Sequence, residues 1–131
     1  MKQKILRECL RKAKLRNSPL YHPDWGSYHH FCFIVQENKI VKYGMNRTAN
    51  AIPIHGFGAK RHKIHAEIDA YHKARRILNN KKTFEVVNIR LNRQNELRSA
   101  APCAHCTSFL AFVGCSKTFY TTNSGFEQTG T

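Results

Sequence analysis

The chain has 131 residues, of which 41% are hydrophobic and 23% are charged. This length predicts one domain, residues 1–131, able to bury roughly two-thirds of the surface of its unfolded chain. No segment approaches the ~20 consecutive apolar residues of a membrane span, and charged residues interrupt the N-terminal stretch where a signal peptide needs an apolar core. These features exclude a membrane-spanning protein and predict a cytoplasmic one.

The charge balance is strongly basic. Twenty-two Lys and Arg against eight Asp and Glu give a net charge of +14. Charge of this size on a small domain favours a polyanionic partner, although basic surfaces also serve solubility alone. Two local runs favour the partner: residues 1–16, and Lys60-Arg61-His62-Lys63 just before a histidine motif. The charge therefore predicts single-stranded nucleic acid as the partner.

The first half of the chain predicts a helix followed by a hairpin. Residues 2–16 place apolar side chains on one helical face and basic side chains on the other, and the pattern stops before Pro19. Residues 28–36 and 39–45 are rich in aromatic and β-branched residues and are separated by Glu37-Asn38, as in a β-hairpin. In the loop before them, Tyr21 and Trp25, with Tyr28 of the first strand, are candidates for stacking on an unpaired base.

The second half predicts alternating helices and strands. Residues 46–63 form a long polar segment, interpreted as part of an active-site wall. The elements expected after it are a helix at 64–79, a strand at 84–91, a polar loop at 92–101, a helix at 103–113, a strand at 117–122 and a short fifth strand. This order implies an α/β fold with a mixed central sheet of about five strands and helices on both faces. The directions of the last two strands stay open.

Two short motifs predict one metal site. They are His65-Ala66-Glu67 and Pro102-Cys103-Ala104-His105-Cys106. One imidazole and two thiolates are zinc ligands, and three protein ligands leave the fourth position open, as in catalytic zinc sites. Cys103 and Cys106 leave the same face of one helical turn, whereas His105 points off that face and is not expected to be a ligand.

The other three cysteines, Cys9, Cys32 and Cys115, lie in apolar patterns, where free cysteine behaves as a small hydrophobic residue. They do not indicate a disulfide framework. Cysteine usage therefore agrees with a reducing compartment.

The paired motifs resemble those of the zinc-dependent cytidine deaminase superfamily, with the resemblance covering about residues 27–122. It implies the cytidine deaminase three-layer fold, one zinc ion held by His65, Cys103 and Cys106, and hydrolysis of cytosine to uracil and ammonia. It implies that Glu67 is the general acid and base. It also implies that Asn46 contacts the substrate sugar or base; alternatively, Asn46 is only a turn residue that closes the strand. For Ala66 it implies backbone groups near the base.

Three functions fit these observations. The first is a deaminase of cytosine in single-stranded DNA or RNA, which the charge favours. The second is a deaminase of free cytidine, deoxycytidine or dCMP, which agrees with the short chain. Some members of the superfamily with this function assemble as homo-oligomers. The third is a non-catalytic nucleic-acid-binding protein with a structural zinc, which Glu67 argues against. A tRNA adenosine deaminase is a weaker alternative, because such proteins usually carry more chain after the last strand.

Overall fold

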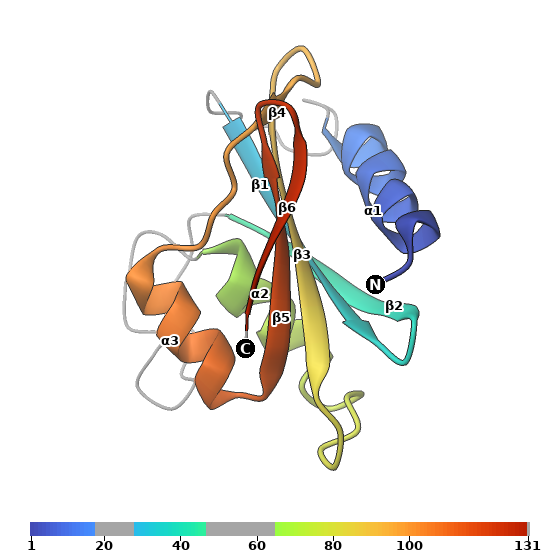
Figure 1. Cartoon of the computed structure of the whole chain (residues 1–131), viewed down its shortest axis with the longest axis vertical. Coiled ribbons are helices and arrows are strands. Elements are labelled where there is room, and N and C mark those ends of the chain that lie inside the picture. Colours follow the sequence, from blue (N-terminus) through green and yellow to red (C-terminus); the bar gives the residue numbers. More distant parts are fainter. Residues whose placement is uncertain (18–27, 47–64, 131) are drawn as a thin grey trace.

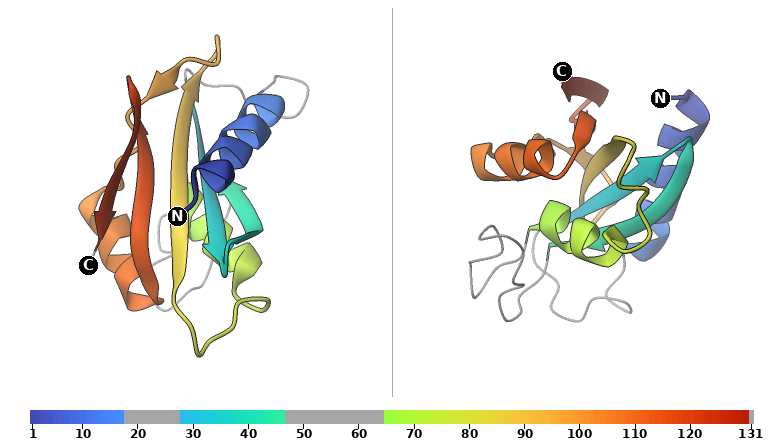
Figure 2. Two further views of the ribbon diagram at one scale, coloured as in Figure 1. Left: turned by 45° about the vertical axis from the view of Figure 1, so that its right-hand side comes forward. Right: turned by 90° about the horizontal axis from the view of Figure 1, so that it is seen from below.

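The computed structural model describes residues 1–17, 28–46 and 65–130. Within them, one mixed sheet lies between helix α1 on one face and helices α2 and α3 on the other (Figures 1 and 2). The elements are α1 (Gln3–Arg16), β1 (Tyr28–Gln36), β2 (Lys39–Met45), α2 (Ala66–Ala74), β3 (Phe84–Asn92), β4 (Leu97–Arg98), α3 (Ala104–Phe112), β5 (Cys115–Thr122) and β6 (Gly125–Gly130). None of these helices is long and apolar enough to cross a membrane.

The sheet runs in the order β2-β1-β3-β5-β6, and β4 pairs with β3 beyond the part of β3 that β5 reaches. β3 and β5 are parallel, and every other pair is antiparallel. The predicted α/β architecture, with a mixed sheet and helices on both faces, is therefore confirmed. The parallel pairing settles the direction of β5 that the sequence leaves open.

The β1–β2 hairpin begins and ends where the sequence predicts. Its two turn residues, Glu37 and Asn38, have φ angles of 53° and 61°. Positive φ at both central positions is the geometry of the type I′ turn, whose twist matches that of paired strands. The tight turn pairs Gln36 with Lys39, and a register shift between Ile34 and Val35 then brings Met45 opposite Phe31.

The prediction is wrong for the end of one helix and for one loop, and β5 begins at Cys115, two residues before its predicted start. The helix expected at 64–79 ends at Ala74, where Ala74 O accepts hydrogen bonds from the N–H groups of both Ile77 (2.8 Å) and Leu78 (3.0 Å). Beyond this turn, Gln36 at the end of β1 accepts a hydrogen bond from Asn79 N–H (2.9 Å) and donates one to Asn79 O (3.1 Å). The stretch expected as loop at 92–101 contains β4, which raises the strand count from about five to six. There the side chain of Asn92 accepts hydrogen bonds from the N–H groups of Gln94 and Glu96 and turns the chain back toward β3.

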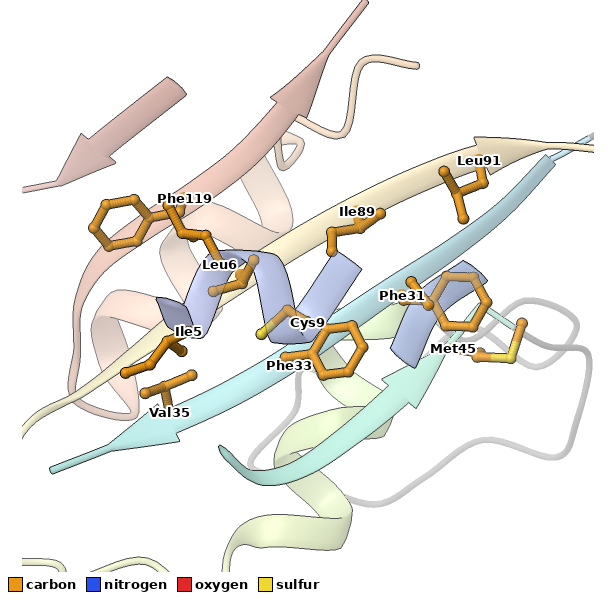
Figure 3. Close-up of a cluster of buried hydrophobic side chains, with 12 residues drawn as sticks. Ile5, Leu6, Cys9, Phe31, Phe33, Val35, Met45, Ile89, Leu91 and Phe119 are labelled. Atoms are coloured by element: carbon orange, nitrogen blue, oxygen red, sulfur yellow. The ribbon is translucent and has the colours of Figure 1, made fainter. Parts of the chain in front are cut away.

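One face of the sheet packs against α1 as the apolar pattern predicts. The buried side chains of this helix, Ile5, Leu6, Cys9 and Ala13, meet alternate residues of β1 and β3. Figure 3 shows the contact, with Cys9 beside Phe33 and with Ile89 and Leu91 on the neighbouring strand. Burial of this stripe holds an otherwise basic helix to the sheet.

The other face packs against α2 and α3, and a glycine sets how close α2 comes. A Cβ atom on Gly44 of β2 would lie 2.3 Å from the backbone N of Ala70. Only glycine allows two backbones to approach this closely. The contact places the N-terminus of α2 beside the end of β2, where the predicted site residues lie.

Candidate zinc site and active site

The candidate ligands lie at the N-termini of two helices. His65 is the N-cap residue of α2, and Cys103 is the N-cap residue of α3, where its sulfur accepts a hydrogen bond from Cys106 N–H at 3.5 Å. Unpaired N–H groups and the helix dipole give each N-terminus a partial positive charge. Both N-terminal positions are therefore suitable places for anionic groups.

The three ligand atoms converge on one point. His65 Nδ1 lies 3.1 Å from Cys106 Sγ and 3.9 Å from Cys103 Sγ, and all three atoms lie within 4.8 Å of one another. Zn–N and Zn–S bonds of about 2.0 and 2.3 Å at a tetrahedral angle separate nitrogen from sulfur by about 3.5 Å. The donor types and spacing therefore fit zinc. Among the described residues, His105 is not part of this group.

Exposure differs between the ligands in a way that leaves one side of the site accessible. Cys106 is fully buried, whereas His65 and Cys103 are exposed. Burial raises the pKa of the Cys106 thiol, and the nearby carboxylate of Glu67 raises it further. Because zinc binds the thiolate, ligation at Cys106 must displace a proton.

Glu67 lies beneath the ligands with its side chain 1% exposed. Its Oε2 accepts a hydrogen bond of 3.0 Å from Asn88 Nδ2. Its Oε1 is buried and has no hydrogen-bond partner among the described residues. A buried carboxylate oxygen without a partner is unusual in folded proteins. Glu67 thus has one atom held by the protein and one available to a bound molecule.

Asn46 and Ala66 border the site from two elements. The backbone N–H of Asn46 donates to His30 O (3.1 Å), and its side-chain Oδ1 accepts from His30 N–H (2.9 Å), so Asn46 extends the pairing of β1 with β2. Ala66 is buried and is the first residue of α2, where backbone N–H groups lack intrahelical acceptors. Contact of either residue with a substrate stays a prediction.

Three polar residues near the site escape motif-based reasoning. Asp69 of α2 is fully buried and accepts a hydrogen bond from Met45 N–H. Asn88 of β3 is fully buried, and the ring of His30 on β1 has its pKa lowered, chiefly by burial. The sequence feature that could have indicated them is a polar residue inside an apolar strand, such as Asn88 between Val87 and Ile89. Nothing in the spacing of either metal motif indicates these residues.

Other predictions fall on residues that the structure leaves undescribed. They concern Tyr21, Trp25, the predicted active-site wall at 46–63 beyond Asn46, and the basic run at 60–63. Tyr28 begins β1, but its side chain is also outside the description. Stacking of these aromatic residues on a base therefore stays a prediction.

A sequence model of the cytidine and deoxycytidylate deaminase zinc-binding region matches residues 2–122. The chain belongs to this family. Zinc is therefore its cofactor, and His65, Cys103 and Cys106 form the candidate zinc site. The resemblance drawn from the two motifs is confirmed.

Solved structures share the fold of this deaminase-family chain. The dCMP deaminase from the cyanophage S-TIM5, in complex with dCMP and dUMP, matches with a TM-score of 0.59 and 19% identity over 92% of this chain and 82% of that one. The apo form of the same enzyme matches with a TM-score of 0.57 and 19% identity over 92% and 84%. No curated protein sequence matches the chain.

Proposed function

We propose that the chain is a hydrolytic deaminase that converts the cytosine of free deoxycytidylate to uracil. The observation that carries this proposal is the buried carboxylate of Glu67, with Oε1 unpartnered, beneath three side chains that fit zinc. A purely structural zinc site has no need of that carboxylate. The nucleotide is favoured because the similar cyanophage enzyme is described in complex with dCMP and dUMP.

The residues divide the chemistry between them. His65, Cys103 and Cys106 would hold zinc, which when bound lowers the pKa of a water molecule toward about 7. Glu67 Oε1 would accept a proton from the water, deliver it to N3 of the ring, and transfer a second proton to the departing amine. A C4–O bond would form and the C4–N bond would break, with the second proton coming from the oxygen newly bonded to C4, so that deoxyuridylate and ammonia would leave. No electron transfer is required.

The direct test compares substrates. Purified protein is incubated separately with dCMP, cytidine, deoxycytidine, single-stranded DNA and RNA, and each uracil-containing product is quantified by chromatography. We expect dCMP to give the largest kcat/KM. Turnover restricted to oligonucleotides would reject the free nucleotide, and absence of turnover with every substrate at full zinc content would reject the enzymatic function.

A second substrate class, cytosine in a single strand, is favoured by one surface feature. A groove of about 510 Å³ lies between α1, β2 and α2. Its cationic lining residues are Arg11, Lys12, Arg16, Lys42 and Lys73. Two acidic side chains offset part of this charge, since Glu8 pairs with Arg11 and Asp69 with Lys73. A basic groove with the apolar side chains of Leu15 and Ile40 in its wall suits a nucleic-acid backbone.

Salt dependence tests this second function. For single strands, log Kd changes with log salt by about 0.7 per neutralised phosphate. The triple variant Lys12→Gln, Arg16→Gln, Lys42→Gln should reduce the slope for a single-stranded oligonucleotide. A matched variant with the same charge change on α1 outside the groove, Lys4→Gln, Arg7→Gln, Lys14→Gln, should change it less. If both variants lower the salt-dependence slope equally, the groove is not a specific binding site and contributes only to the general positive charge.

A further inference from the structure

A small polar cluster interrupts an apolar face of the sheet directly below the candidate site. Asn88 lies opposite Cys32 in the pairing of β3 with β1, and His30 lies opposite Arg90, two pairs further along and on the same face. The next residues on this face, Ile34 and Val86, belong to the apolar core under α2 and α3. Polar side chains at this depth are costly unless they are bonded or serve a site.

Asn88 contacts both chain segments that carry the candidate ligands. Its Nδ2 donates to Glu67 Oε2 at 3.0 Å and also approaches Ala100 O at 3.4 Å. Glu67 follows His65 on α2, and Ala100 precedes the Cys103 turn of α3. Asn88 is fully buried, so water cannot replace it in these contacts.

The orientation of the Asn88 amide is fixed by chemistry. Asn88 Nδ2 is the atom that faces Glu67 Oε2, and an amide nitrogen only donates hydrogen bonds. The amide oxygen then points away from Glu67. The buried atoms that lack a hydrogen-bond partner in the described part of the chain include Glu67 Oε1, Asn88 Oδ1 and His30 Nε2, which come from three different elements. Glu67, which carries one of these atoms, interacts electrostatically with His30 and with the candidate ligand Cys106.

We propose that Asn88 is a positioning residue that, by holding Glu67 Oε2, orients Oε1 toward the reacting water and base. A glutamate has three side-chain torsions, and a hydrogen bond to one oxygen fixes the direction of the other. This inference rests on the proposed function of Glu67 as the proton-transfer group. Asn88 itself touches neither the metal ligands nor, on this proposal, the substrate.

The test replaces the amide while keeping its shape. Asn88→Leu keeps the branching of the side chain and removes the donor, although its two methyl groups are bulkier than the amide. We expect kcat with the best substrate to fall about 10- to 100-fold, a part of the 10²- to 10⁴-fold that general acid–base catalysis supplies. KM should stay within about threefold of the wild-type value. Zinc content should equal that of the wild type within error. A kcat within about threefold of the wild type at full zinc content would overturn the proposal.

A double-mutant cycle separates positioning from mere support of the fold. Because Asn88 acts through Glu67, adding Asn88→Leu to Glu67→Gln should lower kcat little further. If the two residues acted independently, the fold losses of kcat would multiply in the double variant. Multiplying effects would overturn the proposal. If Glu67→Gln keeps full activity, the proposed function fails; if Glu67→Gln is inactive and Asn88→Leu is fully active, only the role of Asn88 fails.

Two further variants guard against misfolding. Asn88→Ser is smaller and keeps a hydroxyl donor. If Asn88→Leu does not fold, the same test compares Asn88→Ser with Asn88→Ala. We expect the Ser variant to retain the higher kcat, and equal kcat values would overturn the proposal. Asn92→Ala on the same strand removes a buried amide that bonds Glu96. It should lower the melting temperature and leave kcat unchanged. A loss of kcat in Asn92→Ala equal to that in Asn88→Leu would assign both to general destabilisation.

Discussion

The carboxylate of Asp69 accepts a hydrogen bond of 3.1 Å from the backbone N–H of Met45 and thereby joins α2 to the end of β2. Asp69 is fully buried, and the partly exposed Lys73 offsets its charge with Nζ at 3.0 Å. The bond links the helix that begins after His65 and carries Glu67 to the strand that leads into Asn46. The relative placement of these site residues thus depends on a side chain that belongs to neither metal motif.

Asp69→Ala should destabilise the fold and impair the site together. The substitution leaves the buried N–H of Met45 without its acceptor, which costs about 1–3 kcal/mol. Asp69→Asn keeps an acceptor oxygen and should recover most of the stability. Urea unfolding of the three proteins measures the difference, and equal stability of Ala and Asn variants would show that the hydrogen bond contributes nothing.

Zinc should be present at about one ion per chain and should depend on three residues. Elemental analysis of His65→Ala, Cys103→Ala and Cys106→Ala should show loss of zinc, since two remaining ligands hold it poorly. Cys115→Ala is the matched control, because this partly buried thiol bonds Lys117 O on β5 instead. Retention of zinc in Cys103→Ala with loss in Cys115→Ala would contradict the ligand assignment.

Glu67→Gln should remove activity and keep the metal. The amide preserves shape but cannot accept the proton, so kcat should fall at least 10²-fold, the lower range of a general acid–base contribution. Zinc content and melting temperature should remain close to those of the wild type. Substantial turnover at normal zinc content would exclude proton transfer by Glu67.

Asn46→Ala tests whether Asn46 contacts substrate or only closes the strand. If it contacts the sugar or base, KM should rise about tenfold, as expected for a lost hydrogen bond of about 1.4 kcal/mol. Asn46→Asp keeps the acceptor for His30 N–H and controls for the local structure. Normal KM in the Ala variant would leave Asn46 as a turn residue.

Stability should fall above pH 9 because of Cys9. Burial in the α1 contact raises the pKa of this thiol to about 12. The unfolded chain releases the proton near the ordinary value of 9 and the folded chain does not, so the folded state binds more protons and loses stability as pH rises. The loss reaches about 1.4 kcal/mol at pH 10. The change between pH 8 and 10 should be smaller in Cys9→Ala, and an unchanged pH dependence would contradict this origin.

The sequence predicted local structure well where one physical pattern governs it. The hairpin bounds follow from alternation and a two-residue turn, and α1 follows from its apolar stripe. The chain after α2 could not be predicted, because Gln36 binds Asn79 from a distant strand. The site shows the same division. Ligand types and spacing indicate the metal, whereas the contact of Asn88 with Glu67 exists only after β3 and α2 pack.

The packing of α1 on β3 has a consequence for biosynthesis. The apolar stripe of this helix, Ile5, Leu6, Cys9 and Ala13, is covered partly by Val87, Ile89 and Leu91, which leave the ribosome long after it. Until then the nascent chain carries an uncovered amphipathic helix beside an incomplete sheet, a species prone to association. The basic side chains on the outer face of α1 repel other copies during this interval, so the positive charge protects the chain before any substrate or partner meets it.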